Sequence, residues 1–257
     1  MSIEYSLDGG LARIYINRSE KHNALTREMR EELANRVEQA SSDPAVRAVL
    51  MSARGPNFCA GADLGQFGGE DPAAARRRMQ AGGHRLIRAL NDIEKPVVAS
   101  VRGHVIGIGW ALVLACDFII ASATTRFSLP FLRTGLIADT GVIWFLAREL
   151  GTLRAKELVF SGRPLGAEEA RGLGLCTEVV DDPTLDARAL DRAIELSKGP
   201  TFSLGLMRKL FSLSRAPALT DYLEWESLMS PQLRHTEDFH EGIRAFKEKR
   251  PPEFKGL

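Results

Sequence analysis

Two apolar segments, each followed at once by a loop of small residues, most constrain the fold of this 257-residue chain. Residues 46–51 and 97–101 have the composition of buried strands, and glycine-containing loops at 55–64 and 103–109 follow them. Segments with a helical spacing of apolar residues separate these strands. Such an alternation of strands and helices predicts an α/β fold.

The chain divides into a strand-containing part and a part with helices only. The first part opens with a predicted hairpin around Gly9 and Gly10, and Thr26 and the Asp71–Pro72 pair are positioned to begin helices. Strand–strand–helix units continue to about residue 195, and only amphipathic helices follow. We therefore predict a core at 1–195 and a C-terminal helical region at 196–257.

Composition narrows the function classes. The formal net charge is +1 and the charges are balanced, which argues against a nucleic-acid partner. The three cysteines are far apart, so neither a disulfide framework nor a metal site is expected. The N-terminus lacks the pattern of a signal peptide and the longest apolar run is too short for a bilayer, so we expect a cytoplasmic protein with no membrane contact.

The two glycine-containing loops are the strongest chemical signal. Small residues let a ligand approach main-chain N–H groups, and the loop at 103–109 leads into a helix whose N-terminus favours negative charge. Two such N–H groups that converge on one point would stabilise an enolate oxygen. Taken one at a time, however, each loop is better explained as a turn.

The pair of loops together resembles the enoyl-CoA hydratase/isomerase (crotonase) superfamily. The segments that carry the resemblance are 17–25, 58–64, 95–117, 135–151, 167–175 and 246–251. The resemblance implies a spiral of repeated strand–strand–helix units with a C-terminal helical region for oligomerisation. It also implies an acyl-CoA substrate, no separate cofactor, no metal, and a homotrimer or a dimer of trimers.

Site residues follow from the same resemblance. The oxyanion donors would be the N–H groups of Ala62 and Ile108, where the family usually has glycine at the second position. The residues expected to contact the CoA part of the substrate are Ala24, Ala60, Asp63 and Leu64, with Phe246 and Lys249 reaching the CoA of an adjacent subunit. Phe246 could equally anchor the last helix in the core.

The carboxylates decide which reaction is expected. Hydratases of this family use two glutamates, and the matching positions here hold Ala111 and Phe131, so hydration is not favoured. Asp139 matches the single acid of family isomerases, within a segment whose apolar residues should bury it and raise its pKa. An alternative makes Asp139 the N-cap of a helix that starts at Thr140.

One carboxylate suffices for an isomerase that shifts a Δ3 double bond to Δ2. Within the family, residues 200–206 make the chain most similar to the phenylacetate-pathway 1,2-epoxyphenylacetyl-CoA isomerase type, which opens a ring epoxide, and Phe131 would suit an aromatic or apolar acyl group. Two alternatives stay open. One is a hydrolase similar to 4-chlorobenzoyl-CoA dehalogenase that uses Asp139 and His84, and the other is a CoA-thioester-binding protein without turnover.

Overall fold

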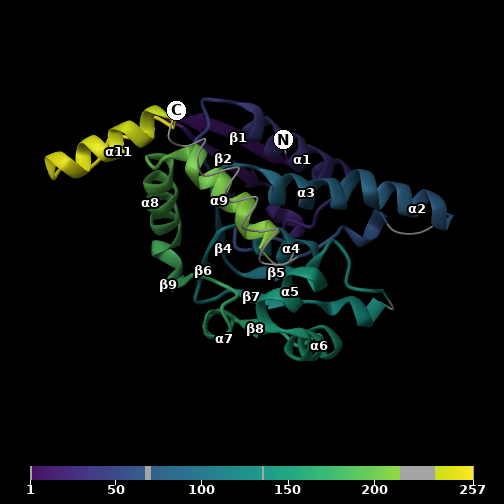
Figure 1. Cartoon of the computed structure of the whole chain (residues 1–257). Coiled ribbons are helices and arrows are strands. Elements are labelled where there is room, and N and C mark those ends of the chain that lie inside the picture. The colour runs from purple at the N-terminus through teal and green to yellow at the C-terminus, as the bar shows by residue number, and fades with distance from the viewer. Residues whose placement is uncertain (1, 67–70, 135, 215–234, 257) are drawn as a thin grey trace.

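A six-stranded sheet forms the centre of the protein, which is described here from a computed structural model covering residues 2–66, 71–134, 136–214 and 235–256 (Figure 1). Its strands, in spatial order, are β1 (Ile3–Asp8), β2 (Leu11–Ile16), β3 (Ala48–Ala53), β4 (Val97–Val101), β6 (Phe118–Ser122) and β9 (Glu178–Val180). The β1–β2 hairpin is antiparallel and the other neighbours are parallel. The predicted hairpin around Gly9 and Gly10 is thus confirmed.

A small second sheet lies beside the first. It consists of β5 (His104–Ile106), β7 (Arg126–Ser128) and β8 (Leu165–Gly166). Strand β5 pairs parallel with β7, and it occupies the loop at 103–109 in which the sequence predicted no strand. This sheet therefore holds the second glycine-containing loop in an extended, hydrogen-bonded form.

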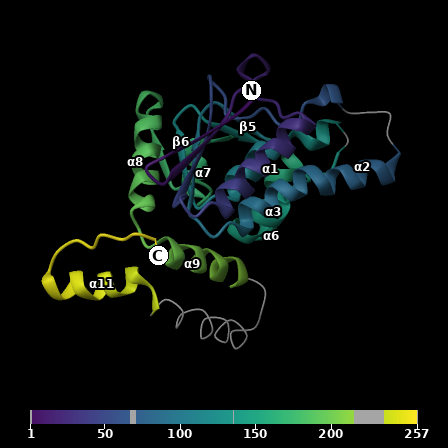
Figure 2. The same cartoon turned by 90° about the horizontal axis from the view of Figure 1, so that it is seen from above.

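Helices lie on both faces of the large sheet. The described helices are α1 (Arg27–Ser42), α2 (Pro72–Met79), α3 (Arg85–Asp92), α4 (Ile108–Leu114), α5 (Val142–Leu150), α6 (Thr152–Ser161), α7 (Ala167–Gly172), α8 (Leu185–Ser197), α9 (Thr201–Leu213) and α11 (Glu237–Glu248). A π-helical segment, Gln80–His84, joins α2 to α3. Figure 2 shows α8 on one side of the sheet and α1 and α3 on the other.

The two apolar clusters explain these layers. Successive strand residues point to opposite faces of a sheet. Leu50 packs in the cluster that includes Ala189 of α8, whereas Met51 packs in the cluster that includes Leu33 of α1 and Leu90 of α3. A sheet buried on both faces accounts for the continuous apolar runs seen in the sequence.

Capping side chains begin the helices where the sequence predicted them. The Thr26 hydroxyl accepts a hydrogen bond from the Met29 N–H at 3.2 Å. The Asp71 carboxylate accepts from the N–H groups of Ala73 and Ala74 at 2.9 and 3.0 Å. Both bonds satisfy N–H groups that have no partner inside the helix.

The C-terminal tail returns to the core through Arg47. Its guanidinium donates to the carbonyl oxygens of Gly199 at 2.6 Å and Phe254 at 2.9 Å. Helix α11 itself projects away from the sheet in both views (Figures 1 and 2). The boundary predicted between residues 195 and 196 lies inside α8, and the division into two regions stays a prediction.

Candidate active site

The two glycine-containing loops lie side by side and are joined by main-chain hydrogen bonds. The Cys59 N–H donates to the His104 carbonyl, and the Ile106 N–H donates to the Cys59 carbonyl, both at 2.9 Å. These bonds form a parallel bridge between Cys59 and Val105, both of which are fully buried. The position of each loop therefore depends on the other.

Glycine is required where the loops touch. A Cβ on Gly109 would lie 2.7 Å from the Cys59 Cβ and 3.1 Å from the Cys59 carbonyl oxygen. Gly107, just before α4, has a φ of +55°, which other residues rarely adopt. Burial raises the pKa of the Cys59 thiol to about 12, so Cys59 acts as packing and not as a nucleophile.

The predicted oxyanion donors lie on these two loops. Ala62 is flanked by Gly61, whose carbonyl accepts from the Leu25 N–H at 2.8 Å, and by Asp63, whose N–H donates to the Leu25 carbonyl at 3.0 Å. Ile108 is the first residue of α4. Within the described ranges, neither the Ala62 N–H nor the Ile108 N–H donates to a protein acceptor. Ile108 itself is buried.

Arg18 fastens the first loop to the segment around Ala24. Its guanidinium donates to the Asp63 carboxylate at 2.6 Å and to the Ala24 carbonyl at 2.9 Å. This contact holds the pKa of Asp63 below its usual range. Ala60 joins the group because its N–H donates to the His22 carbonyl at 3.0 Å. The structure thus brings Ala24, Ala60 and Asp63 together. The sequence analysis did not predict that Arg18 links them.

Leu64 begins the turn that follows, and its side chain is 62% exposed. Exposure of an apolar side chain at this place leaves it free to contact a ligand that runs along the loop. Its predicted contact with the CoA part of a substrate stays a prediction.

Asp139 lies on the loop before α5, next to a residue in an unusual conformation. Thr140 has a φ of +53°, which is rare for a β-branched residue. Burial is the main cause that raises the pKa of the Asp139 carboxyl, as the sequence predicted, while the Thr140 hydroxyl and the charges of Arg30 and His84 act in the opposite direction. Helix α5 begins at Val142 and has no side-chain cap, so the N-cap interpretation of Asp139 is wrong.

The π-helical segment brings the Asp139 loop next to the second glycine-containing loop. A Cβ on Gly83 would lie 3.0 Å from the Thr140 Cγ2 and 3.8 Å from the Ile108 Cδ1. Gly83 therefore lies between the Asp139 loop and Ile108. A π-segment inserts an extra residue into a helix and is frequent at functional sites. The sequence predicted one helix here, since an inserted residue leaves no clear mark in a short apolar pattern.

The structure places His84 and Arg30 near Asp139. His84 is the last residue of the π-segment and is partly buried. Arg30 is partly buried on α1. Nothing in the sequence distinguished Arg30 from the other arginines, because its position depends on how α1 packs against the π-segment.

Phe131 and Ala111 occupy apolar surroundings. A Cβ on Gly107 would lie 3.5 Å from the Phe131 Cζ, so the ring lies over the second loop. Ala111 is fully buried in α4. By contrast, the side chains of Leu132, Leu136 and Ile137 are 56%, 41% and 79% exposed. The expectation that this whole apolar segment buries Asp139 is therefore wrong for these residues in the single chain.

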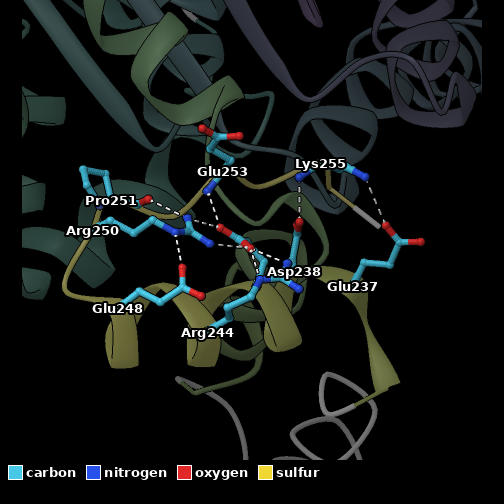
Figure 3. Close-up of polar contacts among 9 residues, drawn as sticks. Glu237, Asp238, Arg244, Glu248, Arg250, Pro251, Glu253 and Lys255 are labelled. Atoms are coloured by element: carbon cyan, nitrogen blue, oxygen red, sulfur yellow. Dashed lines mark hydrogen bonds and ion pairs between the residues drawn. The ribbon is translucent and has the colours of Figure 1, made fainter.

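Lys249 lies apart from these groups in the same chain. It directly follows α11, is exposed, and has a φ of +54°. The Glu241 carboxylate holds the tail beyond it, accepting from the Arg250 guanidinium and the Glu253 N–H at 2.6 and 3.0 Å. Figure 3 shows Arg250 and Glu253 in this group of polar contacts. The Phe246 side chain lies outside the described residues. The structure does not bring Lys249 to Ala62 or Asp139 of its own chain.

Two features are absent from the described residues. No helix among them is both long and apolar enough to cross a bilayer. In the same ranges, no group of three or more His, Cys, Asp or Glu side chains is placed to hold a metal ion.

Comparison with known proteins gives one consistent answer. Residues 6–257 match the model of the enoyl-CoA hydratase/isomerase family. The chain is 34% identical to a probable enoyl-CoA hydratase of Rhodobacter capsulatus, covering 99% of this chain and 98% of that protein. It is also 34% identical to the 1,2-epoxyphenylacetyl-CoA isomerase of Escherichia coli, with 97% of each chain covered.

A solved structure agrees with the sequence comparisons. The crystal structure of a putative enoyl-CoA hydratase from Streptomyces coelicolor A3(2) matches with a TM-score of 0.96 and 30% identity, covering 100% of this chain and 95% of that one. The predicted α/β crotonase fold with C-terminal helices is therefore confirmed. The chain belongs to the enoyl-CoA hydratase/isomerase family, whose members act on acyl-CoA thioesters.

Proposed function

We propose that this protein is an acyl-CoA isomerase that moves a Δ3 double bond to Δ2 with Asp139 as its proton carrier. The observation that carries the proposal is the position of Asp139, a partly buried residue on the loop whose Thr140 meets Ile108 across Gly83. Burial raises the pKa of this carboxyl. A carboxyl with a raised pKa is a more effective acid–base catalyst near neutral pH.

The reaction needs one proton carrier and one anion site. Ionised Asp139 removes a proton from the α carbon, and the electron pair of that C–H bond moves into the thioester to form an enolate. The N–H groups of Ala62 and Ile108 donate to the enolate oxygen. The electron pair then returns, the double bond forms between the α and β carbons, and Asp139 gives its proton to the γ carbon. The enzyme ends in its starting state.

The surrounding residues argue for isomerisation over hydration. Ala111 and Phe131 stand where family hydratases carry the two glutamates that activate water, and neither side chain can transfer a proton. Ala111 is fully buried, and the Phe131 ring lies over the second loop. An apolar wall of this kind favours a dry site, in which the enolate is not quenched by water.

The same site could also open a ring epoxide of an aryl-CoA. The relative named 1,2-epoxyphenylacetyl-CoA isomerase is 34% identical to this chain, and the Phe131 ring offers an aromatic acyl group a stacking surface. The two reactions share the acyl-CoA class, the enolate site and Asp139. We therefore propose epoxide isomerisation as a second reaction of the same class.

One observation supports a different enzyme. The charge of His84 lowers the pKa of Asp139. In an enzyme similar to 4-chlorobenzoyl-CoA dehalogenase, the Asp139 carboxylate would attack a ring carbon, halide would leave, and His84 would activate water against the ester. Because His84 acts on Asp139, a dehalogenase-like hydrolase is the second candidate function. Halide release from a halobenzoyl-CoA, lost in His84→Gln, would support it over the isomerase.

The test follows Δ3-enoyl-CoA and aryl-CoA substrates by the absorbance of the conjugated product. We expect turnover by the wild type and a loss of about 10²–10⁴-fold in Asp139→Asn, with unchanged affinity for the CoA ester. His84→Gln separates the two candidate enzymes, because the isomerase should retain turnover and the dehalogenase-like enzyme should lose it. Near wild-type rates in Asp139→Asn would overturn the proposal. Tight binding of the CoA ester without turnover of any substrate would indicate a binding protein that is not an enzyme.

We further propose that the working form is a homotrimer or a dimer of trimers. Helix α11 projects from the core, with Phe239 and Ile243 at 39% and 45% exposure, and it carries Lys249 away from the site of its own chain. An adjacent subunit would cover this helix and bring Lys249 to a bound CoA. Light scattering of the purified protein tests this, and a monomer would contradict it.

A further inference from the structure

Thr140 combines a strained backbone with a buried side chain. Its φ of +53° lies in the left-handed region that a β-branched residue rarely adopts, and Gly141 follows with a φ of +79°. Thr140 is nevertheless only 4% exposed. A strained conformation of this kind persists only where the surrounding structure holds it, and such residues gather at functional sites. The contacts around Thr140 must therefore outweigh the strain.

The Thr140 hydroxyl is directed at the preceding residue, Asp139. It donates to the Asp139 carbonyl oxygen at 2.8 Å, and the Asp139 Oδ1 is a second acceptor at 3.4 Å. A hydroxyl has a single proton, so these two oxygens share it. The Val142 N–H donates to the same carbonyl at 3.3 Å. One side chain thus contacts both the main chain and the carboxyl group of Asp139.

The Thr140 methyl group packs against the π-segment. A Cβ on Gly83 would lie 3.0 Å from the Thr140 Cγ2, which is closer than ordinary van der Waals contact, whereas it would lie 3.8 Å from the Ile108 Cδ1. A Cβ on the neighbouring Gly82 would meet no atom of the described residues within 4 Å. Both glycines are buried. Gly83 therefore provides the space for the Thr140 methyl group, and Gly82 is a matched position without that contact.

The two contacts of Thr140 depend on each other. Its hydroxyl and methyl group are bonded to the same carbon, and a β-branched side chain rotates little about χ1. A methyl group held against Gly83 therefore keeps the hydroxyl on Asp139. Serine would offer the hydroxyl without this constraint, and valine would offer the shape without the hydroxyl.

We propose that Thr140 is a positioning residue, which uses its methyl contact with Gly83 to hold its hydroxyl on Asp139 and so fixes the direction of the proton-carrying carboxyl group. This inference rests on the proposed function, in which Asp139 moves a proton of the substrate. A proton carrier must lie within hydrogen-bond reach of that proton. Thr140 therefore acts on the chemical step through Asp139, and not on the binding of the CoA ester.

The first test compares kcat and KM in two variants of Thr140. Thr140→Val removes the hydroxyl and keeps the shape, so kcat should fall about tenfold at unchanged KM, because a misplaced catalytic group slows the chemical step. Thr140→Ser keeps the hydroxyl and should retain a larger share of kcat. Thr184→Val is the matched control, since the Thr184 hydroxyl also donates to a main-chain carbonyl at 2.8 Å, directly before α8.

The second test is a double-mutant cycle across the methyl contact. In Gly83→Ala the added Cβ presses on the Thr140 methyl group, so kcat should fall about three- to tenfold, whereas Gly82→Ala should keep it. Thr140→Ser removes that methyl group. In the Gly83→Ala background it should therefore restore part of kcat, which is the non-additive result expected of residues in contact.

The third test does not depend on turnover. The Asp139 carboxyl carbon is titrated by NMR in the ligand-free protein, with its signal identified by its absence in Asp139→Asn. The Thr140 hydroxyl lowers the pKa of Asp139, so the midpoint should rise in Thr140→Val and stay in Thr184→Val. Arg30 and His84, whose charges act in the same direction, are unchanged in both variants. A rise in a protein without isomerase turnover would keep the role of Thr140 and reject the proposed function.

Other results would overturn the inference. Wild-type kcat in Thr140→Val, with an unmoved midpoint, would reject it and leave the proposed function intact. A raised KM at unchanged kcat would make Thr140 a substrate-binding residue. A lower kcat that accompanies a lower Tm, with an unmoved midpoint, would give Thr140 a structural role only. Additive losses in Gly83→Ala and Thr140→Ser would show that Gly83 does not act through Thr140.

Discussion

The two sides of the proposed site are built in different ways. On one side, Cys59 and Val105 are fully buried and their loops are joined by main-chain hydrogen bonds of 2.9 Å. On the other side, the Asp139 loop has Ile137 at 79% exposure and Thr140 at a φ of +53°. The first side is fixed by the core, and the second depends on a short loop with few packed side chains.

This difference explains how one family performs several reactions. Main-chain N–H groups keep their chemistry whatever the side chains are, provided that the fold holds them in place. The proton-carrying side chains can change without disturbing that frame. Relatives named as a hydratase and as an isomerase are both 34% identical to this chain, which is what such a division of labour allows.

The largest expected effect comes from disturbing the fixed side. In Gly109→Ala, the new Cβ would lie 2.7 Å from the Cys59 Cβ, so the second loop must shift. We expect about 1–3 kcal/mol of lost stability and a loss of turnover of about 10²-fold, because a displacement of about 1 Å misplaces the Ile108 N–H. Thermal unfolding and kcat/KM measure the two effects.

Two variants sharpen this prediction. Gly172→Ala is the matched control, because nothing lies within 4 Å of the added Cβ. Replacing Cys59 by glycine in the Gly109→Ala background removes the side chain that clashes and should restore part of the activity. Full activity of Gly109→Ala alone would show that the loops are not locked together.

The sequence predicted the fixed side better than the Asp139 side. The strands before both loops, the glycines and the Thr26 and Asp71 caps are local signals, and the structure confirms them. The β5 strand and the Gln80–His84 π-segment were missed, since each exists only through pairing or packing with distant parts of the chain.

For the Asp139 side, the sequence predicted the direction of the pKa shift but not its surroundings. Apolar neighbours in sequence suggested that Leu136 and Ile137 bury the carboxyl, yet both are exposed in the single chain. Gly83 of the π-segment packs against the neighbouring Thr140, and the charge of Arg30 on α1 lowers the pKa of Asp139, although both residues are far from the loop in sequence. Neighbours in sequence were therefore a poor guide to the groups around Asp139, because tertiary packing determines which residues lie near it.

A smaller effect is expected where Arg18 holds the first loop. Arg18→Met removes the bonds to Asp63 at 2.6 Å and to Ala24 at 2.9 Å. If these residues line the nucleotide site, KM for an acyl-CoA should rise about five- to tenfold, the effect of losing about 1 kcal/mol of binding, while kcat stays near its wild-type value. Steady-state kinetics measures both.

Arg13→Met is the control for this change. Arg13 forms a longer contact of 3.6 Å with the exposed Asp8 carboxylate, and surface pairs of this kind contribute little. A lower kcat at unchanged KM in Arg18→Met would contradict the assignment, because it would connect the first loop to the chemistry and not to binding.

The smallest expected effect is a change in stability, and it should have opposite signs for the Asp139 and Asp63 carboxylates. Burial raises the pKa of Asp139 in the folded protein, so ionisation of Asp139 disfavours folding above that pKa. Asp139→Asn removes this cost and should stabilise the protein at neutral pH by about 1 kcal/mol, a Tm rise of about 2–4 °C. The gain should shrink as pH falls through the raised pKa and vanish below the pKa of the unfolded chain.

Asp63 should behave in the opposite way. Arg18 lowers its folded-state pKa, so its charge stabilises the folded protein above the unfolded pKa, and that contribution is lost as pH falls through the lowered value. Asp63→Asn should therefore lower Tm at neutral pH, and both variants should approach the wild type in acid. If both variants lowered Tm at neutral pH, the Asp139 carboxylate would be stabilised in the folded protein as Asp63 is. That result would remove the physical reason for Asp139 to act as a base.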